Sequence, residues 1–350
     1  MDPPTAAAAM RRWENLQEDL VGCIGDGVED LKCYASVRGA CTAWRRALKP
    51  PSPLLLIGQN STATAFSLPT RRSFSVRAIP GPYFGSKDGW VAYLSDCWPW
   101  LWAGFCVFIL SNPMTALDVF LPLLGCENRL VTKVVFAPSP AKDDFTAAAI
   151  CGVTGLGYVV AWDKEWTILD PLRLHARYQL TDVLFYGKGT VYYLTWCGDV
   201  HVLHLAELRR IGPTLVTTVE PLLSANNHPF EFDPETSFKP FHGKLSSFTG
   251  AKHLVFCEGN LYQIWGNASC RVNLCLPSGS GRRWVEQNEI FVLRYYPQHQ
   301  PCWDAVTGLG AYSVFVGRNN AVSIYAQGVS RLKGNCVYWI SRFTSYVVGF

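Results

Sequence analysis

The chain has 350 residues, of which 49% are hydrophobic and only 17% are charged, and its formal net charge is +4. An average globular protein carries about 25% charged residues, so this composition excludes a disordered chain, a collagen-like chain and a coiled coil. The 13 Trp, 15 Tyr and 19 Phe residues can supply a large apolar core. The length allows two domains, or one large all-β domain with a small appendage.

The basic charge is spread along the chain in pairs of arginines. We interpret most of these pairs as solvated turns and helix ends: Arg11–Arg12, Arg45–Arg46, Arg71–Arg72, Arg209–Arg210 and Arg282–Arg283. A nucleic-acid-binding domain usually gathers its basic residues on one face. We therefore expect no nucleic-acid partner.

The 13 cysteines are spread singly, and no Cys-x-x-Cys pair occurs. A secreted disulfide scaffold is shorter and has an even number of cysteines. Residues 1–10 lack the basic and then apolar segments of a signal peptide. These features predict a reducing compartment, namely the cytoplasm, the nucleus or both.

Residues 98–110 (WPWLWAGFCVFIL) form the most apolar stretch of the sequence. A membrane-spanning helix needs about 20 apolar residues, so this stretch is too short and we expect no membrane partner. Its Pro and Gly residues favour a buried pair of strands joined by a turn. The stretch is more apolar than such strands require, and the sequence offers no account of the excess.

Residues 12–49 have the apolar periodicity of helices, after a tail (residues 1–11) that we expect to be disordered. Leu16, Leu20 and Ile24 recur every four residues, and a second stripe runs from Leu31 to Trp44. Three glycines weaken the first helix by about 1 kcal/mol each if they are helical: Gly22, Gly25 and Gly27. So short a segment cannot bury both helices alone. It either caps the larger domain or completes its core on a partner protein.

Residues 50–350 alternate β-branched and aromatic runs with turns rich in Gly, Pro, Asn and Asp. The expected strands are residues 90–94, 106–110, 131–136, 147–151, 158–161, 182–186, 191–195, 200–205, 253–256, 261–265, 290–295, 313–316, 322–325 and 336–340. Hairpin units recur at a period of roughly 40–50 residues, which is typical of a β-propeller. Dividing the segment by that period predicts about six or seven blades.

No catalytic or cofactor-binding arrangement emerges from the sequence. Cys197, His201 and His204 match no standard zinc spacing, and the two histidines would point to opposite faces of a strand. Asp143 and Asp144 lie in an expected polar loop tip. Neither a nucleophile elbow nor a P-loop is present. We therefore expect no catalytic residue, no metal and no cofactor, and we interpret most tryptophans as core residues rather than sugar-binding platforms.

The N-terminal segment resembles an F-box, whose pattern is a Leu-Pro pair, apolar residues at helical spacing and then Val-Cys-x-x-Trp. The proline of that pattern is replaced here by Gln17. The resemblance implies that a Skp-type adaptor binds seven residues: Leu16, Gln17, Leu20, Ile24, Val37, Cys41 and Trp44.

The rest of the chain resembles the plant F-box proteins that carry a C-terminal KIB-type β-propeller. The matching stretches are residues 85–92, 110–115, 133–136, 182–186, 198–200, 314–319 and 332–338. Family members usually continue for one or two strands beyond the last of these stretches. The completeness of the last blade is therefore left open.

The resemblance implies a substrate-recognition subunit of a Skp–cullin–F-box E3 ubiquitin ligase, which is not itself an enzyme. Its F-box would bind the adaptor, and through it a cullin–RING ligase, while the propeller binds an unidentified target protein. Two alternatives stay open. One is a stand-alone propeller with a degenerate F-box, suggested by Gln17 and the three glycines. The other is a carbohydrate-active enzyme, which would need carboxylates converging near Trp90, Trp162 or Trp265.

Overall fold

The computed structural model describes residues 13, 16–49, 51, 54–59, 62–80, 82–95, 105–125, 131–169, 179–187, 189–205, 220–221, 233–267, 271–275, 281–329, 332–340 and 345–349. The expected disordered tail (residues 1–11) and most of the apolar stretch 98–110 lie outside these residues. The end of that stretch forms β6 (Phe105–Cys106) and the start of β7 (Phe108–Asn112). The single strand expected over 106–110 is therefore divided at Val107.

Three short helices begin the described chain: α2 (Glu18–Asp26), α3 (Leu31–Gly39) and α4 (Thr42–Ala47). Glu18 and Asp19 occupy the first turn of α2, where negative charge suits the helix dipole. The second apolar stripe spans two helices, because Cys41 is extended (φ −157°) and its Sγ accepts a hydrogen bond from the Trp44 N–H. A cap of this kind ends one helix and starts another.

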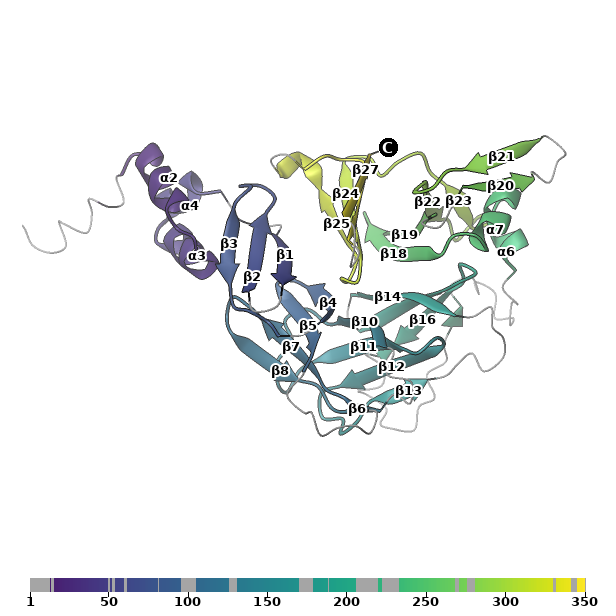
Figure 1. Cartoon of the computed structure of the whole chain (residues 1–350), viewed down its shortest axis with the longest axis horizontal. Helices are drawn as coiled ribbons and strands as arrows, with labels where there is room; N and C mark the ends of the chain where they lie inside the picture. The colour runs from purple at the N-terminus through teal and green to yellow at the C-terminus, as the bar shows by residue number, and fades with distance from the viewer. Residues whose placement is uncertain are drawn as a thin grey trace, which may run out of the picture.

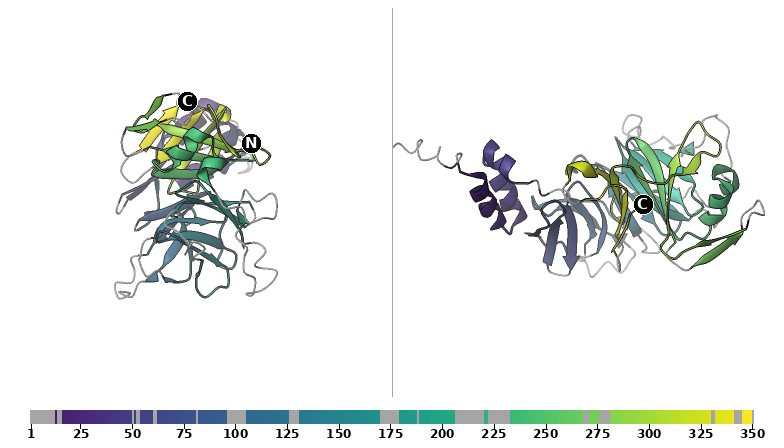
Figure 2. Two further views of the ribbon diagram at one scale, coloured as in Figure 1. Left: turned by 90° about the vertical axis from the view of Figure 1, so that its right-hand side faces the viewer. Right: turned by 90° about the horizontal axis from the view of Figure 1, so that it is seen from above.

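A three-stranded antiparallel sheet follows: β1 (Leu54–Gln59), β2 (Thr62–Ser67) and β3 (Ser73–Val76). The sequence patterns did not predict this sheet. Its strand β3 packs on the helices through Phe74, whose ring centroid lies 5.1 Å from that of Tyr34. Figure 1 shows the sheet between the helices and the remaining β-structure, and Figure 2 shows the helices projecting at one end of the molecule.

Five four-stranded sheets make up most of the remaining chain. The first contains β4 (Tyr83–Lys87), β5 (Trp90–Leu94), β7 and β8 (Leu117–Phe120). The second contains β10 (Val131–Phe136), β11 (Thr146–Cys151), β12 (Gly155–Val160) and β13 (Thr167–Leu169). The third contains β14 (Leu180–Tyr186), β15 (Thr190–Thr195), β16 (Val200–His204) and β17 (Glu220–Pro221).

The fourth sheet contains β18 (Ala251–Cys257), β19 (Asn260–Gly266), β22 (Ile290–Tyr295) and β23 (Trp303–Ala305). The fifth contains β24 (Tyr312–Gly317), β25 (Val322–Tyr325), β26 (Cys336–Ile340) and β27 (Ser345–Gly349). All pairs are antiparallel except β24 with β26. Further elements are β9 (Leu124–Gly125), which pairs with β6, the hairpin of β20 (Val272–Cys275) and β21 (Arg282–Val285), the helices α6 (Pro234–Ser237) and α7 (Pro240–Ser246), and the 3-10 turn η2 (Ala326–Gly328).

The five sheets form a ring. The first strands of successive sheets contact each other, β4 with β10, β10 with β14, β14 with β18, and β18 with β24. The turn after β24 joins the fifth sheet to the first, because the Asn320 N–H donates to the Ser86 carbonyl (3.1 Å). The Asn320 side chain also accepts from the Phe185 N–H (3.0 Å) and donates to the Phe185 carbonyl (3.2 Å), which ties the same turn to β14.

This ring of radial antiparallel sheets is a β-propeller. Within the described residues it has five four-stranded blades, fewer than the six or seven that the repeat length predicted. The first three blades begin at Tyr83, Val131 and Leu180, in keeping with a period near 50, but the next two begin only at Ala251 and Tyr312. The prediction of six or seven blades also counted residues 54–76 as part of the propeller, but these residues form the separate three-stranded sheet.

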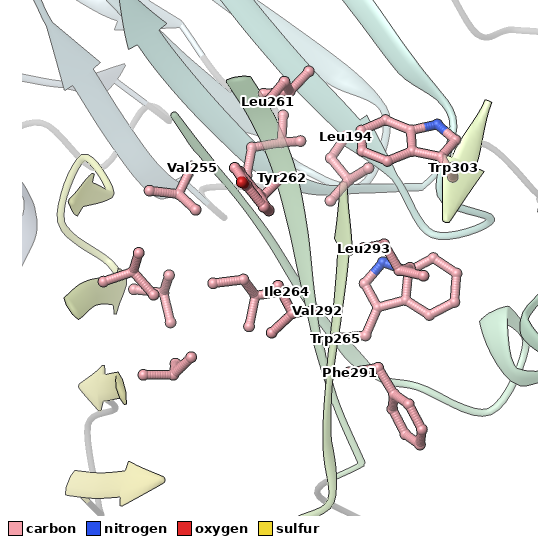
Figure 3. Packing of buried hydrophobic residues seen from close by; sticks show 14 of the residues in the cluster. Leu194, Val255, Leu261, Tyr262, Ile264, Trp265, Phe291, Val292, Leu293 and Trp303 are labelled. Atoms are coloured by element: carbon pink, nitrogen blue, oxygen red, sulfur yellow. The ribbon is translucent and has the colours of Figure 1, made fainter. Parts of the chain in front are cut away.

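The largest part of the core lies between the third, fourth and fifth blades. Trp265 and Trp303 are fully buried there and pack around Phe238, with Trp265 in an edge-to-face contact at 4.9 Å. Figure 3 shows these tryptophans among the aliphatic side chains of the neighbouring strands. Trp265 and Trp303 are therefore core residues, as we expected of most tryptophans, whereas Trp13, Trp162 and Trp284 are exposed.

Candidate functional site

An exposed apolar stripe runs along one face of α2 and the residues before it. We define the α2 stripe as Leu20 and Ile24, which lie four residues apart on one side of α2, together with the exposed Trp13 and Gln17 that precede the helix. Leu20 is 50% exposed and Ile24 is 37% exposed, whereas Val21 on the adjacent face is fully buried. The stripe is therefore an apolar surface left uncovered by the chain's own core.

The other four predicted adaptor contacts have partners within the protein. Leu16, Val37 and Trp44 are half-buried and pack on the core that the helices share with β3. The Trp44 Nε1–H donates to the Trp13 carbonyl at 3.0 Å. Cys41 caps α4. The seven residues thus divide into two sets. The outward set is Gln17, Leu20 and Ile24, and the inward set, Leu16, Val37, Cys41 and Trp44, holds the three helices together.

The glycines of α2 have different surroundings. Gly25 is buried, and a Cβ added there would overlap the Leu48 side chain. Gly22 has open space around its Cα. Gly25 therefore permits close packing of α2 on the segment after α4, and it is not simply a weak position in the helix.

Arg72 anchors the helices to the three-stranded sheet. Its guanidinium donates to the carbonyls of Gly25 (2.6 Å), Asp26 (2.8 Å) and Val28 (2.7 Å), at the C-terminal end of α2. It also lies over the Phe74 ring at 5.1 Å. Our interpretation of Arg71–Arg72 as a solvated turn was therefore wrong for Arg72. The sequence holds no local signal of this role, since the carbonyls lie more than 40 residues away.

The tryptophans singled out in the sequence have contrasting positions on the propeller. Trp90 and Trp265 are buried in apolar clusters. Trp162 is 81% exposed, in the turn between β12 and β13, and it lines a half-open hollow of about 370 Å³ together with Asp143, Val160 and Ala161. Of the three, Trp162 alone can meet a ligand.

Charged groups buried at the ring join three blades. Lys133 on β10 donates to Asp182 on β14 at 2.6 Å, and His253 on β18 lies 3.5 Å from the same carboxylate. The Leu254 N–H donates to Asp182 as well (2.8 Å). Burial alone would raise the pKa of Asp182, but the charges of Lys133 and His253 hold that pKa below its usual value.

A second buried cation, Lys252, lies between the rings of Trp196 (5.0 Å) and Trp265 (5.2 Å). Its ammonium donates to the carbonyls of Ser246 and Thr249, both at 2.7 Å, at the end of α7. Burial lowers the pKa of Lys252 to about 7. These contacts hold the end of α7 against β18 of the fourth blade.

The histidines and cysteines that we considered as metal ligands have separate partners. His201 lies 2.6 Å from Asp199, His204 lies 3.4 Å from the Thr190 hydroxyl, and Cys197 lies 3.1 Å from the Thr195 hydroxyl. In the part of the chain that the structure describes, no group of His, Cys, Asp and Glu is arranged to hold a metal ion. None of the described helices is long and apolar enough to cross a membrane. Cys151, Cys257, Cys302 and Cys336 are buried cysteines.

The ring of five blades with helices at its N-terminal side defines the molecule as a β-propeller protein. A family model described as the KIB1-4 β-propeller matches residues 65–348. The chain belongs to this family. The match begins within β2, so it covers all five blades and leaves the helices outside.

No curated protein matches the sequence significantly. Among solved structures, the chain is similar to a putative 6-phosphogluconolactonase from Bacteroides uniformis, with 12% identity, a TM-score of 0.37 and coverage of 73% of this chain and 83% of that one. It is also similar to YCF48 bound to D1 peptide, with 10% identity, a TM-score of 0.32 and 84% of each chain covered. At TM-scores this low, neither similarity supports a conclusion about this protein.

Proposed function

We propose that this protein is the substrate-recognition subunit of a Skp–cullin–F-box E3 ubiquitin ligase. The helices bind a Skp-type adaptor, the propeller binds the target protein, and the chain itself carries out no chemistry. It works in the cytoplasm, the nucleus or both. The receptor acts by raising the concentration of the target near the ligase.

One observation carries this proposal: the α2 stripe exposes Leu20 and Ile24 although a core is available beneath the same helix. Three residues of this stripe, Gln17, Leu20 and Ile24, are the outward set of the predicted adaptor contacts. Leu20 is 50% exposed and Ile24 37% exposed, so burying what remains of both side chains against a partner would contribute about 1.5–3 kcal/mol. The anchor of Arg72 supports the proposal further, because it fixes the stripe relative to the three-stranded sheet.

The test is capture of a purified Skp-type adaptor by the full-length chain and by Leu20→Asp/Ile24→Asp. We expect the double variant to lose at least about 100-fold in affinity, because two charges would enter an apolar interface. Its Tm should stay close to the wild-type value, since both side chains are exposed. This choice avoids Leu16 and Trp44, whose substitution would also disturb the helical core.

The matched control is Phe120→Asp, which introduces the same charge at a 66% exposed apolar residue of β8. It should bind the adaptor as the wild type does. Adaptor binding that survives Leu20→Asp/Ile24→Asp would reject the role of the stripe. Absence of any binding by the wild type would favour a stand-alone propeller with a degenerate F-box.

A further inference from the structure

Trp162 occupies a backbone position suited to glycine. The Asp163 N–H donates to the Val160 carbonyl (3.1 Å), and the Asp163 carboxylate accepts from the Val160 N–H (2.9 Å), which closes a four-residue turn. Trp162 is the third residue of this turn, with φ +80°. A type II turn has this φ at its third position and favours Gly or Asn there, because a bulky residue is strained.

The side chain gains little from the fold in return for this strain, because 81% of it is exposed. A single exposed apolar residue needs no explanation by itself. A tryptophan that is both strained and exposed is different, since neither feature stabilises the protein. Strained backbone of this kind is often kept at sites that bind or react.

The surroundings of Trp162 are acidic in a chain that is basic overall. The Ala161 N–H donates to the Phe145 carbonyl (2.9 Å), which holds the turn against the loop after β10. The two loops contribute six charged residues with a net charge of −2: Lys142, Asp143, Asp144, Asp163, Lys164 and Glu165. Asp143 lines the hollow beside the indole. An aromatic ring beside a carboxylate suits a cation and disfavours a nucleic acid.

Among the described residues, the other markedly exposed tryptophan of the propeller is Trp284 on β21, which already has a cation. The Arg271 guanidinium lies 4.6 Å from its ring, and Trp284 is 50% exposed. Among the described residues, none places a cation over Trp162. The chain therefore supplies a cation to the ring of Trp284, whereas no described residue supplies one to the ring of Trp162.

We infer that the hollow formed by Trp162 and Asp143 binds a lysine or arginine side chain of the target protein. The cation stacks on the indole, and the carboxylate of Asp143 faces its charge. This inference rests on the proposed function in so far as the partner is the target of a ligase receptor. The target then binds at the end of the second blade, where the β10–β11 and β12–β13 loops meet.

The test measures fluorescence anisotropy of a fluorescein-labelled, glycine-spaced peptide of lysines and arginines, with matched glutamine and glutamate peptides. The full-length wild type should bind the basic peptide most tightly. Trp162→Gly should weaken that binding at least about fivefold, and Asp143→Asn about threefold. Trp284→Ala is the matched control at an exposed tryptophan on another blade, and it should bind as the wild type does.

Thermal unfolding separates recognition from a structural role. Trp162→Gly and Trp162→Asn should keep the wild-type Tm or exceed it, because both residues suit the turn. A fall in Tm of more than about 5 °C in both variants would show that the indole supports the fold, and would overturn the inference. Equal binding of the basic and glutamine peptides, tighter binding of a single-stranded RNA, or equal losses at Trp162 and Trp284 would overturn it too.

Adaptor capture is measured on the same variants. Trp162→Gly should capture the adaptor as the wild type does, because the α2 stripe is unchanged. If the wild type binds the basic peptide at Trp162 but captures no adaptor, the peptide site stands and the ligase role fails. If it captures the adaptor but has no preference for the basic peptide, the ligase role stands and this inference fails.

Discussion

At the scale of single residues, the surroundings of a side chain decide what the same residue type does. Gly22 and Gly25 both lie in α2, yet an added Cβ would meet nothing at Gly22 and would overlap Leu48 at Gly25. Glycine costs a helix about 1 kcal/mol relative to alanine because it loses more backbone freedom on folding. That cost is offset by packing at Gly25 only.

We predict that Gly22→Ala stabilises the protein by about 0.5–1 kcal/mol. Gly25→Ala should instead destabilise it by about 1–3 kcal/mol, because Leu48 would have to move. The two variants are each other's control, and urea unfolding of each would measure the difference. Equal effects of both substitutions would contradict the packing argument.

At the scale of elements, single arginine and asparagine side chains join units that the sequence separates. Arg72 ties α2 to the three-stranded sheet through three backbone carbonyls. Asn320 ties the fifth blade to the third through both polar atoms of its side chain. Each side chain satisfies backbone groups at the edge of an element, where regular secondary structure leaves them without partners.

Arg72→Met should lower the free energy of local opening of α2 by about 2–4 kcal/mol. The substitution removes the hydrogen bonds from the charged guanidinium but keeps an apolar stem like that of the arginine. Hydrogen exchange should then accelerate in α2 and stay unchanged in β10–β19. Arg71→Met is the control, since Arg71 is exposed. Unchanged exchange in α2 would mean that the apolar core alone holds the helices.

At the scale of the whole molecule, the propeller depends on charges buried where its blades meet. Asp182 accepts hydrogen bonds from Lys133 of the second blade and from the Leu254 N–H of the fourth. Breaking a buried ion pair is costly because the remaining charge has no partner. This cluster therefore couples three blades, and its loss should affect the stability of all three.

Asp182→Asn should lower the free energy of unfolding at pH 7 by about 3–5 kcal/mol. The pKa of Asp182 is lowered on folding, so the carboxylate stabilises the folded state above pH 4. That contribution disappears as the pH falls from about 4 through the lowered pKa. The free energy of unfolding, measured at pH 7, 4 and 3, should therefore fall less with decreasing pH for Asp182→Asn than for the wild type. Asp143→Asn, at an exposed carboxylate, should behave as the wild type does in this assay.

Much of the propeller was predictable because its strands are apolar and bounded by turns. Residues 90–94, 131–136, 290–295, 322–325 and 336–340 are strands with the expected bounds. The three strands of residues 54–76 were missed, although Leu54–Gln59 begins with four apolar residues. Thr62–Ser67 and Ser73–Val76 are rich in small polar residues and lack the apolar runs of the predicted strands. A sheet of that composition is stabilised mainly by what it packs against, here the helices.

The candidate site was predictable only in part. Helical spacing identified Leu16, Leu20 and Ile24 as one stripe, but it could not show that Leu16 packs inward while the other two stay exposed. Nor could it separate Trp162 from the buried Trp90 and Trp265, because all three are the same residue type and only the fold decides which of them is exposed. The backbone strain at Trp162 is likewise a property of the folded turn.

The sequence by itself determined the secondary-structure class of the two segments, helical in residues 12–49 and β in residues 50–350, because apolar periodicity and turn residues act over a few neighbours. It also carried the F-box resemblance and most of the blade strands. The tertiary structure decided the number of blades, the closure of the ring by Asn320, the anchoring of α2 by Arg72 and the exposure of Leu20, Ile24 and Trp162. These features depend on contacts between residues far apart in the chain, and local sequence patterns do not encode which distant segments meet.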